Sequence, residues 1–253
     1  MGNLTKVAAG LTLATLLSAQ TAEELVNKNL TAHGGVEKLK ALHSLRMTGK
    51  MQQGSFTVQI GLDSMPPDLV RQTFTVMGMT GMSAYDGTIG WRIMPFMGRK
   101  DPEMLGEDDL RGLQDEADFY GHLVDYKEKG NTIEYLGHDT VDGDDAYRLK
   151  VTLKNGDIVY YYLDPETFLE IRTEMVQFIH GSVRESFAEM GSYKLVNGVY
   201  FPFALEQGSP RNPGETSKMT IDKIEANVTI DPTEFKMPAA ASASSSGPAK
   251  KEF

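Results

Sequence analysis

The chain has 253 residues, of which 40% are hydrophobic and 24% are charged, so it is long enough for one full hydrophobic core. Its 25 Lys and Arg residues against 35 Asp and Glu residues give a formal net charge of −10, which argues against a nucleic-acid-binding protein. Cysteine is absent, which excludes disulfides, thiol nucleophiles and cysteine-held metals, and no apolar run is long enough to span a membrane.

The two ends differ in composition from the rest of the chain. Residues 1–20 begin with one positive charge, continue with an apolar stretch from Val7 to Leu17 and end in small residues, which is the pattern of a secretory signal peptide. With no cysteine at the cleavage point, we expect export to the periplasm of a Gram-negative bacterium without a lipid anchor. Residues 238–253 are small, polar and repetitive, which predicts a disordered tail. Residues 21–237 are then expected to form a single domain.

The domain is expected to begin with two helices. Thr21 and Glu24 form a capping-box pattern, and apolar residues recur at i, i+4 and i+8 from Ala22. Two glycines at 34–35 end this helix, and a shorter helix with one apolar side follows.

From Ser44 onward, apolar residues recur at every second position. The stretch from Phe56 to Leu62 alternates apolar with polar or small residues, which is typical of antiparallel strands with one buried face. Hairpin signals separate such runs at Asp86-Gly87, Asn155-Gly156 and Asn197-Gly198. We count about eleven strands, almost all of them sequential.

One segment interrupts the strands. The apolar residues between 102 and 126 return to helical spacing, which predicts a helical insertion. Because a sheet of eleven strands curls, we expect a mainly β fold with a few α-helices: a strongly curved antiparallel sheet, or unclosed β-barrel, with a helical lid. A β-sandwich is the alternative. The lid residues expected to face the sheet are Leu110, Leu113 and Tyr120.

Methionines concentrate in one segment of the chain, since nine of the 14 lie between Met47 and Met104. Methionine is flexible and polarisable, so this pattern favours a cavity lining that adapts to apolar ligands, although gap filling in a core is the alternative. A curved sheet contains a ligand cavity only if side chains do not fill it.

Several short motifs carry a resemblance to a known family. They are Pro66-Pro67 before Val70-Arg71, Tyr85-Asp86-Gly87 followed by Trp91 and Pro95-Phe96, Tyr162-Leu163-Asp164, and the run from Gly198 to Pro202. In this pattern the chain resembles the LolA/LolB-like outer-membrane lipoprotein-sorting proteins over roughly residues 21–237. The resemblance implies an unclosed barrel whose apolar cavity receives acyl chains. One departure is that the carriers have an arginine directly before the strand-opening proline, where this chain has Met65.

The acidic segment 101–118 contains eight Asp and Glu residues and one basic residue, Arg111. A solvated helix face explains this pattern, with acidic residues favoured near a helix N-terminus. The alternative is a surface that attracts a basic envelope protein as partner.

Signals for an enzyme are weak. The five histidines show no paired spacing of the kind that binds a metal, and no nucleophile elbow or phosphate-binding glycine loop is present. Glu185 and Glu189 share the parity of apolar neighbours, so they are candidates for an inward-facing carboxylate pair. We expect no enzyme activity, no cofactor and no metal.

The sequence therefore predicts a monomeric periplasmic carrier that holds lipid or lipoprotein acyl chains in an apolar cavity and passes them to an envelope partner. The alternatives are an envelope sensor of the same fold, and a scaffold with a filled core. The residues expected to line the cavity are Phe56, Val58, Ile60, Phe74, Val76, Met79, Met82, Trp91, Ile93 and Phe96.

Overall fold

The computed structural model describes residues 20–239. The expected signal peptide, up to residue 19, and the tail from residue 240 lie outside the described residues. Within the described part, the helices are α1 (Ala22–Ala32), α2 (Val36–Lys40) and α3 (Glu107–Glu116), and the short 3-10 helices are η1 (Pro95–Met97) and η2 (Pro232–Phe235).

Fifteen strands make up most of the described chain. They are β1 (Leu45–Gln53), β2 (Phe56–Met65), β3 (Leu69–Val76), β4 (Met79–Asp86), β5 (Gly90–Met94), β6 (Arg99–Met104), β7 (Thr132–Val141), β8 (Asp144–Thr152), β9 (Ile158–Leu163), β10 (Glu170–Ile179), β11 (Ser182–Gly191), β12 (Lys194–Val196), β13 (Val199–Phe201), β14 (Ala204–Gly208) and β15 (Ser217–Ala226).

Thirteen of these strands form one antiparallel sheet in the order β6-β5-β4-β3-β2-β1-β15-β14-β11-β10-β9-β8-β7. The sheet does not close, because β6 and β7 remain its two edges. The predicted fold class, a mainly β unclosed barrel with few helices, is confirmed. The strands outnumber the expected eleven partly because the run at 199–205 breaks at Pro202 into β13, which pairs with β12, and β14, which joins the main sheet.

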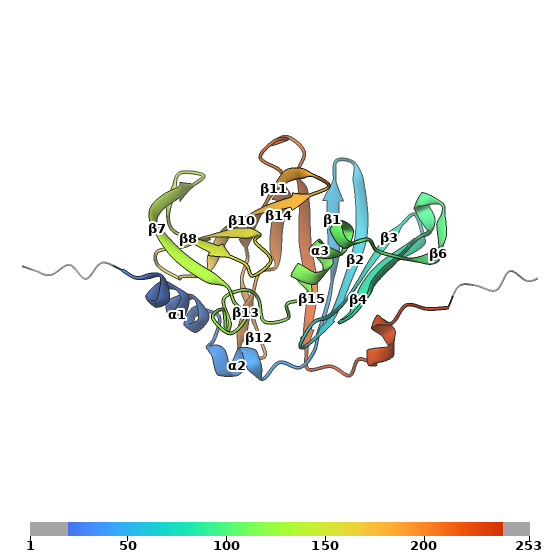
Figure 1. Cartoon of the computed structure of the whole chain (residues 1–253), viewed down its shortest axis with the longest axis horizontal. Helices are drawn as coiled ribbons and strands as arrows, with labels where there is room; N and C mark the ends of the chain where they lie inside the picture. The colour runs from blue at the N-terminus through green and yellow to red at the C-terminus, as the bar shows by residue number, and fades with distance from the viewer. Residues whose placement is uncertain (1–19, 240–253) are drawn as a thin grey trace, which may run out of the picture.

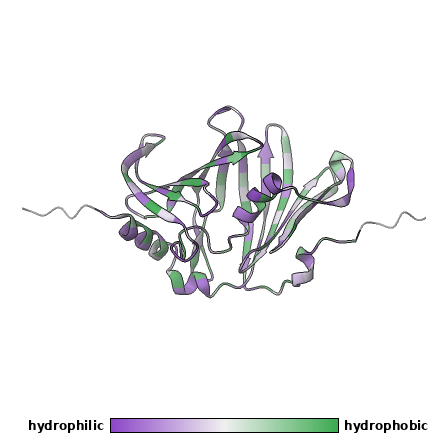
Figure 2. Ribbon diagram, viewed as in Figure 1, coloured by the Kyte–Doolittle hydropathy of each residue, from purple (hydrophilic) through white to green (hydrophobic). Residues whose placement is uncertain are grey.

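The sheet has an inner face, which α1 and α3 cover, and an outer face. Directly paired residues of neighbouring strands lie on the same face. Ile60 pairs with Phe74, and Leu62 of the same strand packs near Leu113 of α3, so these residues mark the inner face of β2 and β3. Alternating hydrophobic and hydrophilic bands along the long middle strands are visible in Figure 2.

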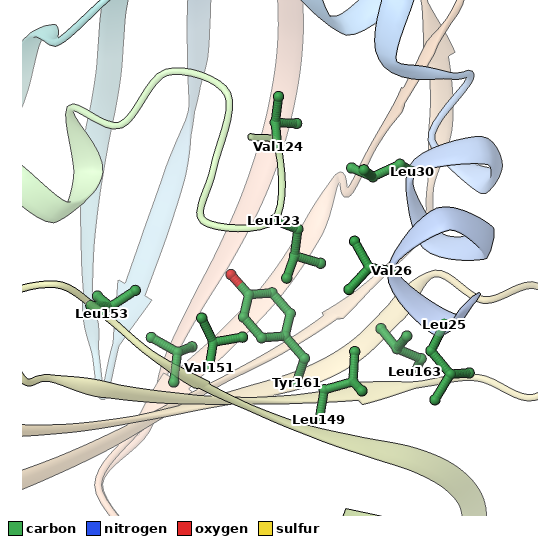
Figure 3. Packing of buried hydrophobic residues seen from close by; sticks show 11 residues of the cluster. Leu25, Val26, Leu30, Leu123, Val124, Leu149, Val151, Leu153, Tyr161 and Leu163 are labelled. Carbon is green, nitrogen blue, oxygen red and sulfur yellow. The ribbon is translucent and has the colours of Figure 1, made fainter. Parts of the chain in front are cut away.

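Helix α1 covers the half of the sheet formed by β7 to β10. Its capping box is present as predicted, with Thr21 and Glu24 each accepting from the other's backbone N–H. Figure 3 shows Leu25 and Val26 of the helix pointing toward Leu149 of the sheet. The buried cluster there contains Leu25, Val26, Leu30, Leu123, Val124, Leu149, Val151, Leu153, Val159, Tyr161 and Leu163.

The helical insertion is shorter than the expected 102–126. Residues 102–104 still belong to β6, and α3 ends at Glu116 with Ala117 as its C-cap. Gly121 then adopts a φ of 74° and Asp125 a φ of 52°, left-handed values that an α-helix does not contain. The chain therefore continues in turns, and Tyr120 packs with the α1 cluster instead of lying on α3.

Candidate functional site

An apolar floor lies in the middle of the inner face. Met47 of β1 pairs with Leu62 of β2, Ile60 of β2 pairs with Phe74 of β3, and β15 adds Met219. Above this floor is a hollow of about 70 Å³, which we call the apolar groove; its lining residues are Met47, Ile60, Gly61, Leu62, Gln72, Phe74, Glu116 and Met219.

Seven of the ten predicted cavity residues lie on the inner face. Strand alternation places three of them along β2 and three along β3 and β4, and the seventh belongs to η1, where its ring lies over Gly81 of β4. Only Ile60 and Phe74 line the apolar groove itself. The seven are Phe56, Val58, Ile60, Phe74, Val76, Met79 and Phe96.

Trp91, Ile93 and Met82 lie on the outer face, so they cannot line the groove. The reason is register: Tyr85, which faces α3, pairs with Gly90, so the next residue, Trp91, points the other way. Trp91 is only 1% exposed, and its indole N–H donates to the carbonyl of Phe235 in η2 at 2.8 Å.

The outer face is covered at this point by the C-terminal segment. Arg71 has the opposite parity to Val70, as its sequence position indicates, but it does not face open solvent. Its guanidinium contacts Asp63 at 2.5 Å and Glu234 of η2 at 2.6 Å. The tryptophan and the arginine therefore hold η2 on the outer face.

Helix α3 packs on the half of the sheet formed by β3 to β5. Leu110 and Leu113 contact the cluster of Val70 and Tyr85. A Cβ at Gly90 would lie 2.4 Å from Cδ1 of Leu110, so a larger residue there would require the Leu110 side chain to shift. Leu110 and Leu113 thus occupy the position predicted for lid residues.

The same helix also contacts the opposite half of the sheet. Arg111 donates to Oδ1 of Asp157 at 2.7 Å and to the carbonyl of Phe178 at 2.9 Å. Asp108 accepts from the backbone N–H of His180 at 3.1 Å. Helix α3 therefore spans the inner face in front of the middle strands (Figure 1).

Most carboxylates of the acidic segment have partners within the chain. Five of the eight contact an arginine, lysine or histidine side chain, so most carboxylates of the segment are engaged within the chain. The pairs are Glu103 with Arg92 and Arg99, Asp108 with His180, Asp109 with Arg92 and His180, Asp115 with His122, and Asp118 with Lys129.

A polar cleft adjoins the apolar groove, with a volume of about 230 Å³ between α3 and strands β3 to β5. Gln72 and Glu116 line both hollows, and the Gln72 amide donates to the Glu116 carboxylate. Desolvation by the surrounding groups, and secondarily the charge of Asp115, raise the pKa of Glu116 to about 7. Because this side chain is still exposed to solvent, it lies at the mouth of the groove and not in the core.

A pocket of about 280 Å³ beside α1 was not expected from the sequence. Glu170 is buried there and accepts from Asn29 at 3.0 Å, and its carboxylate contacts His33 Nε2 at 2.6 Å. These hydrogen bonds to Glu170 lower its pKa although burial opposes the shift. His33 and Glu170 are 137 positions apart, so no local spacing indicated the pair.

A second histidine lines the same pocket. His122 Nδ1 lies 2.9 Å from the Tyr161 hydroxyl, and His122 Nε2 lies 2.8 Å from Asp115 Oδ1. His33 likewise uses both ring nitrogens, the second on the carbonyl of Tyr200 at 2.8 Å. Both imidazoles therefore hydrogen-bond to protein groups through both ring nitrogens.

The expected inward carboxylate pair is not formed. Glu189 pairs across the strands with Arg172 and contacts its guanidinium on the outer face, where Glu185 also lies. Residues 20–239 contain no cluster of three or more His, Asp or Glu side chains that could hold a metal ion. No helix in this part of the chain is long and apolar enough to cross a membrane.

Comparison with known proteins shows the fold. No family model matches the chain, and no curated protein matches it. Among solved structures, it is similar to a LolA superfamily protein from Nitrosomonas europaea, at 14% identity and a TM-score of 0.58, covering 86% of this chain and 98% of that one. A DUF1329 family protein from Desulfovibrio piger is similar at 13% identity and a TM-score of 0.59, over 85% and 97% of the two chains.

A putative outer membrane lipoprotein-sorting protein domain from Vibrio parahaemolyticus is also similar, at 14% identity and a TM-score of 0.55, over 83% of this chain and 97% of that one. The chain therefore has the fold of LolA/LolB-like proteins, as its short motifs predicted. The similarity to these proteins lies in the arrangement of strands and helices, because the sequence identity is only 13–14%.

Proposed function

We propose that this protein binds lipid or lipoprotein acyl chains in the apolar groove under α3 and carries them through the periplasm. The observation that supports this most is the unfilled, methionine-rich floor between the two covered halves of the inner face. Met47 and Met219 lie there beside Ile60 and Phe74, and flexible thioethers suit an apolar guest of variable shape. The similar structure named for lipoprotein sorting supports the same class of ligand.

Binding requires α3 to move. The groove has a volume of about 70 Å³, well below the ~300–1,000 Å³ of typical small-molecule sites. The floor continues beyond the groove to Val58 and to Phe56, which is 60% exposed. Displacing α3 from β3 to β5 would join these surfaces, and the polar contacts of Arg111 on the far side give the helix a second point of attachment.

We propose a binding protein and not an enzyme. The two histidines of the pocket beside α1 hydrogen-bond to Glu170, the Tyr200 carbonyl, Tyr161 and Asp115, and these contacts join separate segments of the fold, which favours a structural role. A basic envelope partner attracted by segment 101–118 would depend on Asp101, Glu107 and Glu116, which have no cationic contact within the described residues.

The direct test is native mass spectrometry with lipid extraction on protein purified from a periplasm without detergent. We expect a stoichiometric acyl species to copurify with the wild type. In the variant Ile60→Glu, which places a carboxylate on the groove floor, the acyl species should no longer copurify. In the matched control Gln59→Glu, the same charge is added one residue away on the outer face and the acyl species should remain.

Folding of the variants is checked by circular dichroism. If Ile60→Glu unfolds, Phe56→Glu serves in its place, because Phe56 is exposed and tolerates a charge. An apo mass for the wild type that does not shift when lipid or acylated peptide is added would overturn the proposal.

A further inference from the structure

The charge around the groove bears on what kind of acyl ligand enters it. The apolar groove and the polar cleft adjoin each other and together form one amphiphilic site, because Gln72 and Glu116 line both of them. A ligand with its chain on the methionine floor would have its head beside these two residues.

The charged groups of the polar cleft have a negative excess. Arg92 of β5 is the cation that lines it, and its guanidinium is already bonded to Glu103 of β6 at 2.6 Å and to Asp109 of α3 at 3.4 Å. Glu103 also contacts Arg99 at 2.6 Å, so Glu103 and Asp109 are balanced by two guanidiniums, and the negative excess of the cleft comes from Glu116. His180, from the turn between β10 and β11, contacts Asp109 at 3.6 Å from the far side.

Glu116 itself has no cationic partner among the described residues. Its hydrogen bond is to the neutral amide of Gln72, its neighbour Asp115 is engaged by His122, and the rest of its surroundings in the groove are apolar. A carboxylate placed beside apolar surface without a cation is stabilised by a ligand group that donates hydrogen bonds or carries positive charge. The same site repels an anionic head.

We infer that the ligand of this site is an acyl chain whose head is a hydrogen-bond donor, cationic or neutral, and that Glu116 with Gln72 receives this head. This inference rests on the proposed acyl binding and adds the chemistry of the headgroup. It excludes free fatty acids and other amphiphiles with an anion next to the chain as preferred ligands.

Three probes with the same twelve-carbon chain test this: dodecylamine, monolauroylglycerol and laurate, titrated by calorimetry below their micelle concentrations at pH 8. We expect the amine to bind about tenfold more tightly than laurate, with the glycerol ester between them, a tenfold change being 1.4 kcal/mol. Glu116→Gln should bring the three affinities together. Glu107→Gln, which removes the same charge from the same helix outside both hollows, should leave the ranking as it is.

The ranking should also weaken at pH 5.5, where Glu116 becomes protonated and the amine stays charged. If the three probes bind the wild type equally, or if the ranking survives Glu116→Gln, the headgroup inference is wrong and acyl binding stands. If none of the three binds the wild type, acyl binding itself fails.

Discussion

The two helices that cover the inner face do so in different ways. Helix α1 buries Leu25, Val26 and Leu30 against a sheet half whose facing residues, such as Leu149 and Leu163, are fully buried. Helix α3 is more polar. It inserts few side chains into the other half and leaves a groove and a cleft beneath it.

The α1 half therefore contains the main buried core, and the α3 half contains the candidate binding site. The α1 half has a pocket beside the helix, but it also contains the largest buried cluster and is further tied by the buried pair of His33 and Glu170, so it supplies rigidity. The α3 half has a small contact of Leu110 and Leu113, and its ion pairs with Arg92 and His180 are partly exposed and contribute little each. The pair of Arg111 with the buried Asp157 is the stronger attachment of this helix. One half of the sheet therefore contains most of the buried core, and the other is the half that we propose opens for the ligand.

The largest expected effect concerns the buried cluster of the α1 half. Leu149→Ala should lower the free energy of unfolding by about 2–5 kcal/mol, because it leaves a cavity in a core where Leu149 is 0% exposed. Leu110→Ala in the α3 half should cost clearly less, since Leu110 is only partly buried. Urea denaturation of both variants measures this, and equal losses would contradict the distinction between the two halves.

The second prediction separates the two faces of the sheet. Trp91→Phe removes the indole donor to the buried carbonyl of Phe235, so it should lower stability by about 1–3 kcal/mol. Because Trp91 lies on the outer face, the affinity for an acyl ligand should stay at the wild-type value. Denaturation and a ligand titration on the same variant test both parts; a large loss of affinity in the folded variant would place Trp91 in the site after all.

The third and smallest effect depends on pH. The contacts of Glu170 raise the pKa of His33, against the burial that lowers it, so this pair stabilises the fold fully below pH 6.5 and loses that effect as pH rises through the raised pKa. The lowered pKa of Glu170 removes the effect again in acid, below pH 4.5. His33→Gln should therefore cost most between pH 4.5 and 6.5, about 1.5 kcal/mol, and less at pH 9. A cost that does not change with pH would show that the pair is not ionised.

The sequence predicted the fold because its local signals agree with one another. The capping box at Thr21, the alternating strands and the hairpin dipeptides each report short-range structure, and sequential antiparallel strands need little else. The apolar residues of β2 and β3 were placed on the correct face because they alternate with polar or small residues, with Gln72 as a polar residue on the inner side of β3.

The errors arose where tertiary contacts decide. Trp91 follows Gly90, which lies against Leu110 of α3. No signal in the neighbouring sequence indicates that η2 covers the indole on the outer face. The helical spacing through Val124 was also misleading, since Gly121 ends any helix there and the later residues pack on α1. The pair of His33 and Glu170 joins distant segments, which one sequence without an alignment cannot reveal.

The central claim, that α3 must leave the sheet before an acyl chain binds, can be tested with a reversible crosslink. The chain has no cysteine, and a Cβ at Gly90 would lie 2.4 Å from Leu110 Cδ1, so Gly90→Cys/Leu110→Cys brings two thiols within reach of a disulfide. The measurement is dodecylamine affinity by calorimetry before and after reduction. We expect the oxidised form to bind at least about tenfold more weakly than the reduced form, which should match Leu110→Cys alone. Equal affinity in the oxidised and reduced forms would contradict the account, because the ligand would then bind without any movement of α3.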